Sequence, residues 1–196
     1  MSAGVLVLHP WWGLNQDVLA CAERLRREGY SVVAPDLYHG RVATTIDEAK
    51  ALMTELGQNS KGAMTEVSEA LTKLGAEADR VAVLGWSMGV SYGWQLAGER
   101  PDVVRGVVAY YGFGDPDAGR LPPILGHFAE HDEFDSVDDV RSTERALKER
   151  GHVAEFHVYP GTKHWLDEPS RPEFDQVASA LAWDRTRAFL ERRLRP

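Results

Sequence analysis

The stretch "LGWSMGV" (residues 84–90) joins an apolar run, "RVAVLG" (80–85), to a helical stretch over 88–98. Ser87 therefore stands where an expected buried strand gives way to an expected helix. Gly85 and Gly89 lie two positions before and after it, where a sharp turn leaves no room for a Cβ atom. A serine in such a turn presents its hydroxyl to a ligand, so the segment predicts a nucleophile.

Similar apolar runs alternate with amphipathic stretches along the whole chain. Strands are expected at 4–10, 31–38, 80–85, 103–112, 122–132 and 153–161, and helices at 15–30, 46–57, 61–75, 88–98, 136–150 and about 171–194. This alternation predicts an α/β protein with a mostly parallel sheet of about six or seven strands and helices on both faces. Gly-x-Ser-x-Gly between a strand and a helix is typical of the nucleophile turn of the α/β-hydrolase fold. Residues 1–196 are expected to form one domain, and segment 112–122 is too short for a cap domain.

The last helix carries its own start signal. Ser170 and Glu173 have the spacing of a capping box, and Pro172 suits a first helical turn. We therefore expect this helix to begin at about residue 171.

The composition excludes several classes of partner. The chain has 196 residues, 43% hydrophobic and 27% charged, with a formal net charge of −8. That charge disfavours nucleic acid and anionic membranes, and the apolar run in "MSAGVLVLHPWW" is too short for a signal peptide or a membrane span. Cys21 is the only cysteine, so no internal disulfide can form, which suits a reducing compartment.

A serine nucleophile needs a histidine base and an orienting acid, which follow it in the order Ser, Asp or Glu, His in this fold. Of seven histidines, His164 in "YPGTKHWLD" is the one that follows the last expected strand. His127 and His157 fall inside strands. His164 is thus the expected base.

The acid is expected after the preceding strand, in "FAEHDEFDS" (128–136). Asp132 is favoured because it is nearest the strand end. Asp135 and Asp115 remain alternatives. The histidines and acids here match no known zinc spacing, so no metal is expected.

Two backbone N–H groups must stabilise the oxyanion of the reaction. Met88, directly after the nucleophile, should supply one. The loop "HPWWG" (9–13) should supply the other. Pro10 has no N–H group, which leaves Trp11, with Trp12 as the alternative.

Aromatic residues gather at the loops expected to follow the strands, where ligands bind in parallel sheets. They predict an open pocket for a small apolar or aromatic group. The expected lining residues are Trp12, Tyr38, Trp86, Tyr111, Phe113, Phe134 and Trp165.

The motifs together resemble the dienelactone hydrolase family over nearly the whole chain. "HPWWGLN", "APDLY", "GWSMGV", "HDEFDS" and "YPGTKHWLDE" are similar to its first oxyanion loop, a strand end, its nucleophile turn, its acid loop and its histidine loop. The resemblance implies a triad of Ser87, Asp132 and His164, an oxyanion hole at Trp11 and Met88, no cofactor and a cytoplasmic location. It also implies that the chain opens near the third strand of the fold.

Three positions depart from the family's founding members. Ser87 replaces their cysteine, Pro10 replaces a glutamate of the first loop, and Glu168 replaces an arginine that holds the substrate carboxylate. Asp167 and Glu168, following His164, disfavour an anionic substrate.

We therefore expect a serine hydrolase of a small ester or lactone, acting as a monomer or homodimer. The alternatives are a thioesterase or peptide hydrolase with the same triad and a non-catalytic binding module.

Overall fold

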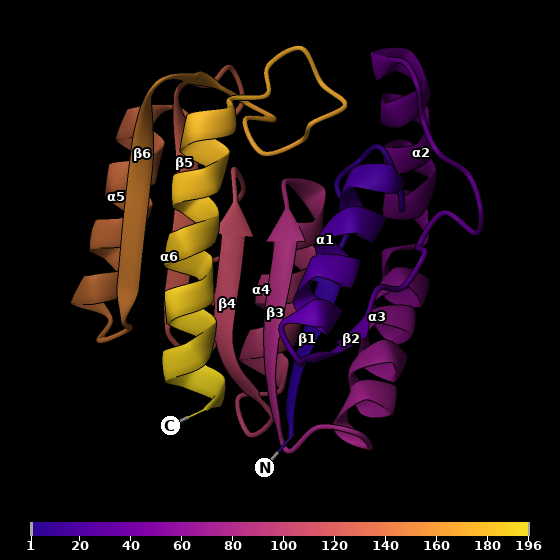
Figure 1. Cartoon of the computed structure of the whole chain (residues 1–196), viewed down its shortest axis with the longest axis vertical. Coiled ribbons are helices and arrows are strands. Elements are labelled where there is room, and N and C mark those ends of the chain that lie inside the picture. The colour runs from indigo at the N-terminus through magenta and orange to yellow at the C-terminus, as the bar shows by residue number, and fades with distance from the viewer. Residues whose placement is uncertain (1, 196) are drawn as a thin grey trace.

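Six parallel strands form a single sheet in the computed structural model, which describes residues 2–195 (Figure 1). The strand order is β2-β1-β3-β4-β5-β6. All five neighbouring pairs are parallel, which confirms the predicted fold class. The strands are β1 (Ala3–Leu8), β2 (Ser31–Val33), β3 (Arg80–Trp86), β4 (Val104–Tyr110), β5 (Ile124–His131) and β6 (Ala154–Lys163).

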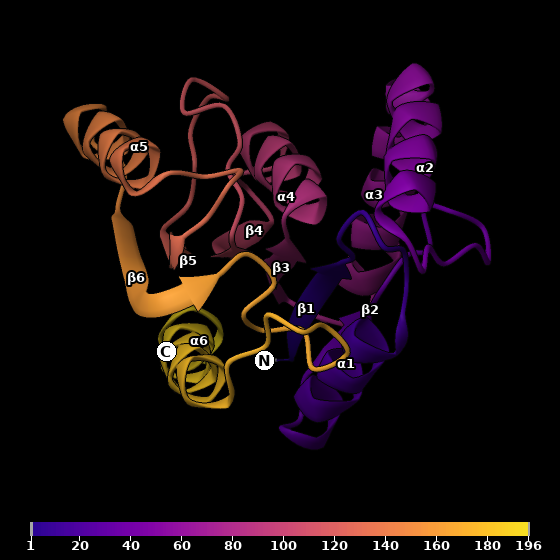
Figure 2. The same ribbon diagram turned by 90° about the horizontal axis from the view of Figure 1, so that it is seen from above.

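Helices cover both faces of this sheet. Seen from above, α1 and α6 lie on one face, and α3, α4 and α5 lie on the other (Figure 2). The buried apolar residues accordingly form two clusters, one beneath each helical layer. This double burial explains why the strands read as continuous apolar runs. The helices are α1 (Gln16–Arg27), α2 (Ile46–Gln58), α3 (Ser60–Gly75), α4 (Met88–Glu99), α5 (Val137–Glu149) and α6 (Gln176–Leu194).

The start of α6 differs from the sequence-based expectation. Asp175, not Ser170, caps this helix, because its Oδ1 atom accepts hydrogen bonds from the N–H groups of Val177 and Ala178 at 3.0 and 2.8 Å. Ser170 instead donates from its N–H and hydroxyl groups to Asp17 of α1. The expected capping box is therefore wrong, and the chain stays in a loop through Pro172. Ser170 and Asp175 are both residue types that cap helices. The hydrogen bonds of Ser170 to Asp17 of α1 hold it away from the helix start, so Asp175 becomes the cap.

Strand β2 is also shorter than the expected 31–38. It lies at the edge of the sheet and pairs with β1 over Ser31–Val33. Pro35 has no N–H group for the ladder, so the chain leaves the sheet before it.

The strand order brings distant loops together at the carboxyl end of the sheet. Leu8 pairs with Gly85, and Trp86 pairs with Tyr110, so the chain segments that follow β1, β3 and β4 are neighbours. The segment after β6 and helix α2 also lie at this end, toward which the arrows point (Figure 1). Residues 111–123, between β4 and β5, contain no helix or strand, which agrees with the absence of a cap domain.

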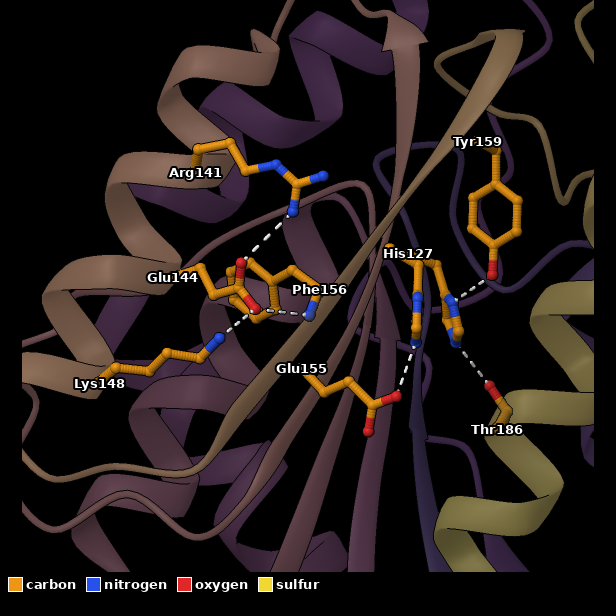
Figure 3. Close-up of polar contacts among 9 residues, drawn as sticks. His127, Arg141, Glu144, Lys148, Glu155, Phe156, Tyr159 and Thr186 are labelled. Carbon is orange, nitrogen blue, oxygen red and sulfur yellow. Dashed lines mark hydrogen bonds and ion pairs between the residues drawn. The ribbon is translucent and has the colours of Figure 1, made fainter.

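A buried polar network ties β5 and β6 to α6. His127 lies between Tyr159 and Thr186, with nitrogen-to-oxygen distances of 2.8 and 3.0 Å (Figure 3). Burial lowers the pKa of His127 well below its usual value, so the ring is neutral and structural.

A second group of polar contacts joins β6 to α5. The Glu144 carboxylate of α5 accepts hydrogen bonds from Arg141, Lys148 and the Phe156 N–H (Figure 3).

No helix within residues 2–195 combines the length and the apolar character that a membrane crossing requires.

Candidate active site

Ser87 occupies a strained corner between β3 and α4. Its backbone angles are φ 46° and ψ −115°, and a positive φ is uncommon for any residue with a side chain. The Ser87 N–H donates to the carbonyl of Tyr110 at 2.9 Å, which fastens the corner to the end of β4. The Ser87 hydroxyl is thereby fixed above the carboxyl end of the sheet.

The two flanking glycines are required by close backbone contacts. A Cβ atom on Gly89 would stand 2.4 Å from the carbonyl oxygen of Leu8, and one on Gly85 would stand 2.8 Å from the carbonyl carbon of Gly89. One turn further along α4, a Cβ on Gly93 would meet Val83 at 2.6 Å. The glycines therefore let α4 begin directly against β1 and β3.

The structure brings His164 and Asp132 next to this serine. His164 follows β6, and its Nε2 atom lies 3.4 Å from the Ser87 Oγ atom. Its Nδ1 atom lies 2.7 Å from Oδ2 of Asp132, which follows β5. Since a carboxylate only accepts, Nδ1 carries the proton, and Nε2 is left free to accept one from the serine.

The loop after β5 also holds the Asp132 carboxylate in place. Its Oδ1 atom accepts hydrogen bonds from the N–H groups of Phe134 and Asp135 at 2.9 and 3.2 Å. The Asp132 side chain is fully buried, and that of His164 is 5% exposed. Asp115 lies in a different loop, where it accepts from the Asp117 N–H. Asp132 is thus the acid in contact with His164.

The two residues expected to supply the oxyanion donors, Met88 and Trp11, line the same pocket as Ser87. Met88 is the first residue of α4, so its N–H has no acceptor within the helix. Trp11 lies in the turn after β1 that is closed by the Gly13 N–H and the Pro10 carbonyl at 3.1 Å. Gly89 contacts the end of β1, which brings this turn close to the start of α4.

An open pocket of about 290 Å³ lies over Ser87. Of the predicted lining residues, Tyr111, Phe113 and Phe134 face it. Its walls also include residues that the sequence reading did not assign to it. The full lining set is Trp11, Met53, Ser87, Met88, Ser91, Tyr111, Gly112, Phe113, Phe134, Asp135 and His164.

The other four predicted aromatic residues are not among the lining residues, which corrects that expectation. Trp12 and Trp165 are buried and pack on one another at 5.5 Å between ring centroids. The Tyr38 hydroxyl donates to the sulfur of Met88 at 3.4 Å. Trp86 donates from its indole to Asp167 at 3.0 Å, beneath α1 and α6. Nearness to a strand end does not determine which face of the sheet receives the side chain.

Of the missed lining residues, Ser91 could have been found from sequence, because it lies four positions after Ser87 on the same face of a helix. Met53 belongs to α2. Its place depends on how that helix packs, for which the sequence carries no local signal.

Asp167 and Glu168 face a second cavity, with Trp86 and Cys21, and not the serine pocket. Burial raises the pKa of Asp167 to about 6 and that of Glu168 to about 8. Tyr111 donates to Glu168 at 2.9 Å, and its ring lies 4.7 Å from that of His164. Asp167 and Glu168, which were expected to disfavour an anionic substrate, therefore lie outside the pocket over Ser87.

Asp132, Asp135 and His164 each offer a possible metal ligand, with all three atoms within 4.8 Å of one another. The hydrogen bond between His164 and Asp132 already uses one such atom of each residue. A metal ion at this place would therefore have to compete with that hydrogen bond.

Comparison with known proteins agrees with this architecture. The model of the dienelactone hydrolase family matches residues 1–194. The protein Usf of Aquifex pyrophilus is 30% identical over 201 residues, covering 96% of this chain and 87% of that protein.

Two solved structures share the fold. A dienelactone hydrolase-like promiscuous phosphotriesterase from metagenomic libraries has a TM-score of 0.83 and 18% identity, covering 98% of this chain and 87% of that one. Esterase PE8 has a TM-score of 0.68 and 19% identity, covering 98% and 93%. With the family match over almost every residue, these findings lead to one assignment: the chain belongs to the dienelactone hydrolase family and is a hydrolase of ester bonds.

Proposed function

We propose that Ser87, His164 and Asp132 form a catalytic triad that hydrolyses a small ester or lactone through an acyl-enzyme. The observation that carries this proposal is the continuous contact from the Ser87 hydroxyl to His164 at 3.4 Å and from His164 to Asp132 at 2.7 Å. The first distance is long for a hydrogen bond, as is common in catalytic sites without substrate. The strained backbone of Ser87 adds support, because strain of this kind concentrates at functional sites.

In the first half of the reaction, the Ser87 oxygen bonds to the carbonyl carbon while its proton passes to Nε2 of His164. The carbonyl oxygen becomes an oxyanion, which accepts hydrogen bonds from the N–H groups of Met88 and Trp11. When the oxyanion collapses, the bond to the alcohol oxygen breaks and this oxygen takes the proton from His164. The acyl group is left on Ser87.

Water then reverses these steps. His164 takes a proton from water as the water oxygen attacks the acyl carbon, and it returns this proton to Ser87 as the carboxylic acid leaves. Asp132 remains ionised and stabilises the imidazolium in both halves. No cofactor takes part in this scheme.

The pocket supports a small substrate. Its volume is about 290 Å³ and four of its eleven lining residues are tryptophan, tyrosine or phenylalanine, which suits a short acyl chain or a compact ring. We also propose a cytoplasmic enzyme, because a chain with one cysteine suits a reducing compartment. A thioester or amide could use the same triad, so thioester and anilide analogues belong in the substrate panel.

The test is hydrolysis of p-nitrophenyl acetate by the parent and by Ser87→Ala. We expect the variant to lose ~10⁴-fold or more in kcat/KM while its fold is kept. Ser142→Ala is the matched control, since Ser142 lies on the exposed side of α5 and bonds to the Asp139 carbonyl. A phosphonate ester should label Ser87, as mass spectrometry would detect. Full activity in folded Ser87→Ala protein would refute the proposal.

A further inference from the structure

Asp135 contributes a charge to the pocket that holds Ser87. It stands in the loop between β5 and α5, beside Phe134, whose side chain is half exposed. Among the lining residues found within residues 2–195, Asp135 is the only aspartate or glutamate, and no lysine or arginine accompanies it.

Its carboxylate has no partner in the described part of the chain. The Asp135 N–H donates to Asp132, but no hydrogen bond or ion pair within residues 2–195 involves its side-chain oxygens. Asp132, the neighbouring acid, is paired with His164 at 2.7 Å and does not line the pocket. Asp135 therefore adds a negative charge that the protein does not neutralise.

We infer that Asp135 sets the charge preference of this esterase, so that esters bearing a positive group are favoured and esters bearing an anionic group are disfavoured against neutral isosteres. This inference rests on the proposed function, because it requires the ester to be attacked by Ser87 in this pocket. It opposes recognition of a substrate carboxylate, for which the pocket offers no lysine or arginine.

The expected size of the effect follows from Coulomb's law. A unit charge about 6 Å from the carboxylate changes binding by about 10- to 100-fold for effective dielectric constants between about 40 and 20. Because the pocket is open, salt should weaken this effect.

The effect should also depend on pH. Burial, followed by the charge of Asp132, raises the pKa of Asp135 to about 6, with Asp139 of α5 acting in the same direction and His164 against it. The carboxylate is thus mostly ionised above about pH 6. Selection for the positive group should grow as the pH rises through this value.

The experiment uses three p-nitrophenyl esters that differ at one tetrahedral centre. They are the esters of 4-(trimethylammonio)butanoate, 5,5-dimethylhexanoate and 4-sulfobutanoate, which end in a positive, a neutral and a negative group of similar size. For the parent at pH 8 and low salt, we expect kcat/KM to fall about tenfold at each step in that order. Using ratios of kcat/KM cancels the protonation of His164, which all three reactions share.

In Asp135→Asn, the kcat/KM values for the three esters should lie within about threefold of one another, and their ratios should no longer depend on pH. Glu133→Gln is the matched control, because it removes the same charge from an exposed position of the same loop that does not line the pocket. It should keep the parent's ratios, and so should Asp135→Glu.

Three outcomes would overturn the inference. One is a set of kcat/KM ratios in Asp135→Asn that matches the parent. The second is a parent that shows no preference at low salt, and the third is a preference of the parent that added salt does not weaken. If Asp135→Asn does not fold, the kcat/KM ratios of the parent at low and high salt still test the inference, because the second and third outcomes need only the parent. Each of these leaves the Ser87-dependent hydrolysis of the neutral ester intact, whereas failure of the proposed function would remove it or make it independent of Ser87.

Discussion

His164 holds Asp132 through one short contact, 2.7 Å between Nδ1 and Oδ2, with the aspartate side chain wholly buried. Both residues stand on loops, and the sheet fixes the distance between those loops because β5 and β6 are neighbours. The register places His131 opposite Lys163, the residues directly before Asp132 and His164. The ends of β5 and β6 therefore bring the side chains of Asp132 and His164 together.

Removal of this acid should impair the proton transfer. In Asp132→Asn, the amide can no longer stabilise the imidazolium or hold Nδ1 as a donor, so kcat/KM for a neutral ester should fall ~10²-fold or more. Asp135→Asn should lose less, because Asp135 makes no hydrogen bond to the ring. Steady-state rates of both variants, with Glu133→Gln as the control, check this order. If Asp135→Asn loses the larger factor, Asp135 is the acid of the triad.

The turn itself can be tested at its glycines. In Gly89→Ala the new methyl would stand 2.4 Å from the Leu8 carbonyl oxygen, so α4 must move away from β1. We expect a loss of about 1–3 kcal/mol in the free energy of unfolding and a fall of ~10²-fold in kcat/KM as Ser87 is displaced. Gly57→Ala is the control, because it lies in α2 with no atom within 4 Å of the added Cβ.

The control should gain up to about 1 kcal/mol from the better helix propensity of alanine. Urea titrations and ester hydrolysis of both variants measure the two effects. A Gly89→Ala protein as stable and active as the parent would show that the corner tolerates a side chain.

Much of this architecture could be predicted from sequence because local signals and the global fold agree. The run "RVAVLG" and the glycines around Ser87 specify a strand, a corner and a helix. The order Ser, acid, His is typical of the fold that this corner indicates, and it directs the search to the loops after the last two strands. These inferences need periodicity and the residue order of a recognised fold.

Which aromatic residues line the pocket could not be predicted in the same way. Strand alternation directs Trp86 to the same face as Ala82 and Leu84, away from the serine. Trp165 has a φ of 66°, an uncommon conformation for tryptophan that no local pattern indicated, and it packs against Trp12. Such side-chain directions depend on packing between distant segments.

Thiol reagents should leave the enzyme active. Cys21 lies on α1 beside the second cavity, and burial raises the pKa of its thiol well above the usual value, so the reactive thiolate is scarce. Incubation with iodoacetamide at pH 8 should leave most of the esterase activity, whereas a phosphonate ester should abolish it. Cys21→Ser, treated in parallel, reports any loss that does not involve this thiol. Rapid inactivation that Cys21→Ser escapes would tie activity to the second cavity.

The buried acid Glu168 should make stability depend on pH. Its pKa rises from 4.5 to about 8 through burial, so between these values the folded state keeps a proton that the unfolded state releases. The contribution of Glu168 to the free energy of unfolding is therefore fully present below about pH 4.5 and is lost as the pH rises to about 8. The loss should amount to several kcal/mol, of the order of 4, by proton linkage.

In Glu168→Gln this loss should disappear, because glutamine stays neutral and its oxygen can still accept the hydrogen bond from Tyr111. The variant should thus be more stable than the parent at pH 9, with the difference shrinking as the pH falls toward 5. Urea titrations from pH 5 to pH 9 measure this difference, and Glu77→Gln, at an exposed position, serves as the charge control. A constant difference between parent and Glu168→Gln across this range would mean that Glu168 is already ionised in the folded protein, held so by a partner such as Arg171, whose positive charge acts on it in the direction opposite to burial.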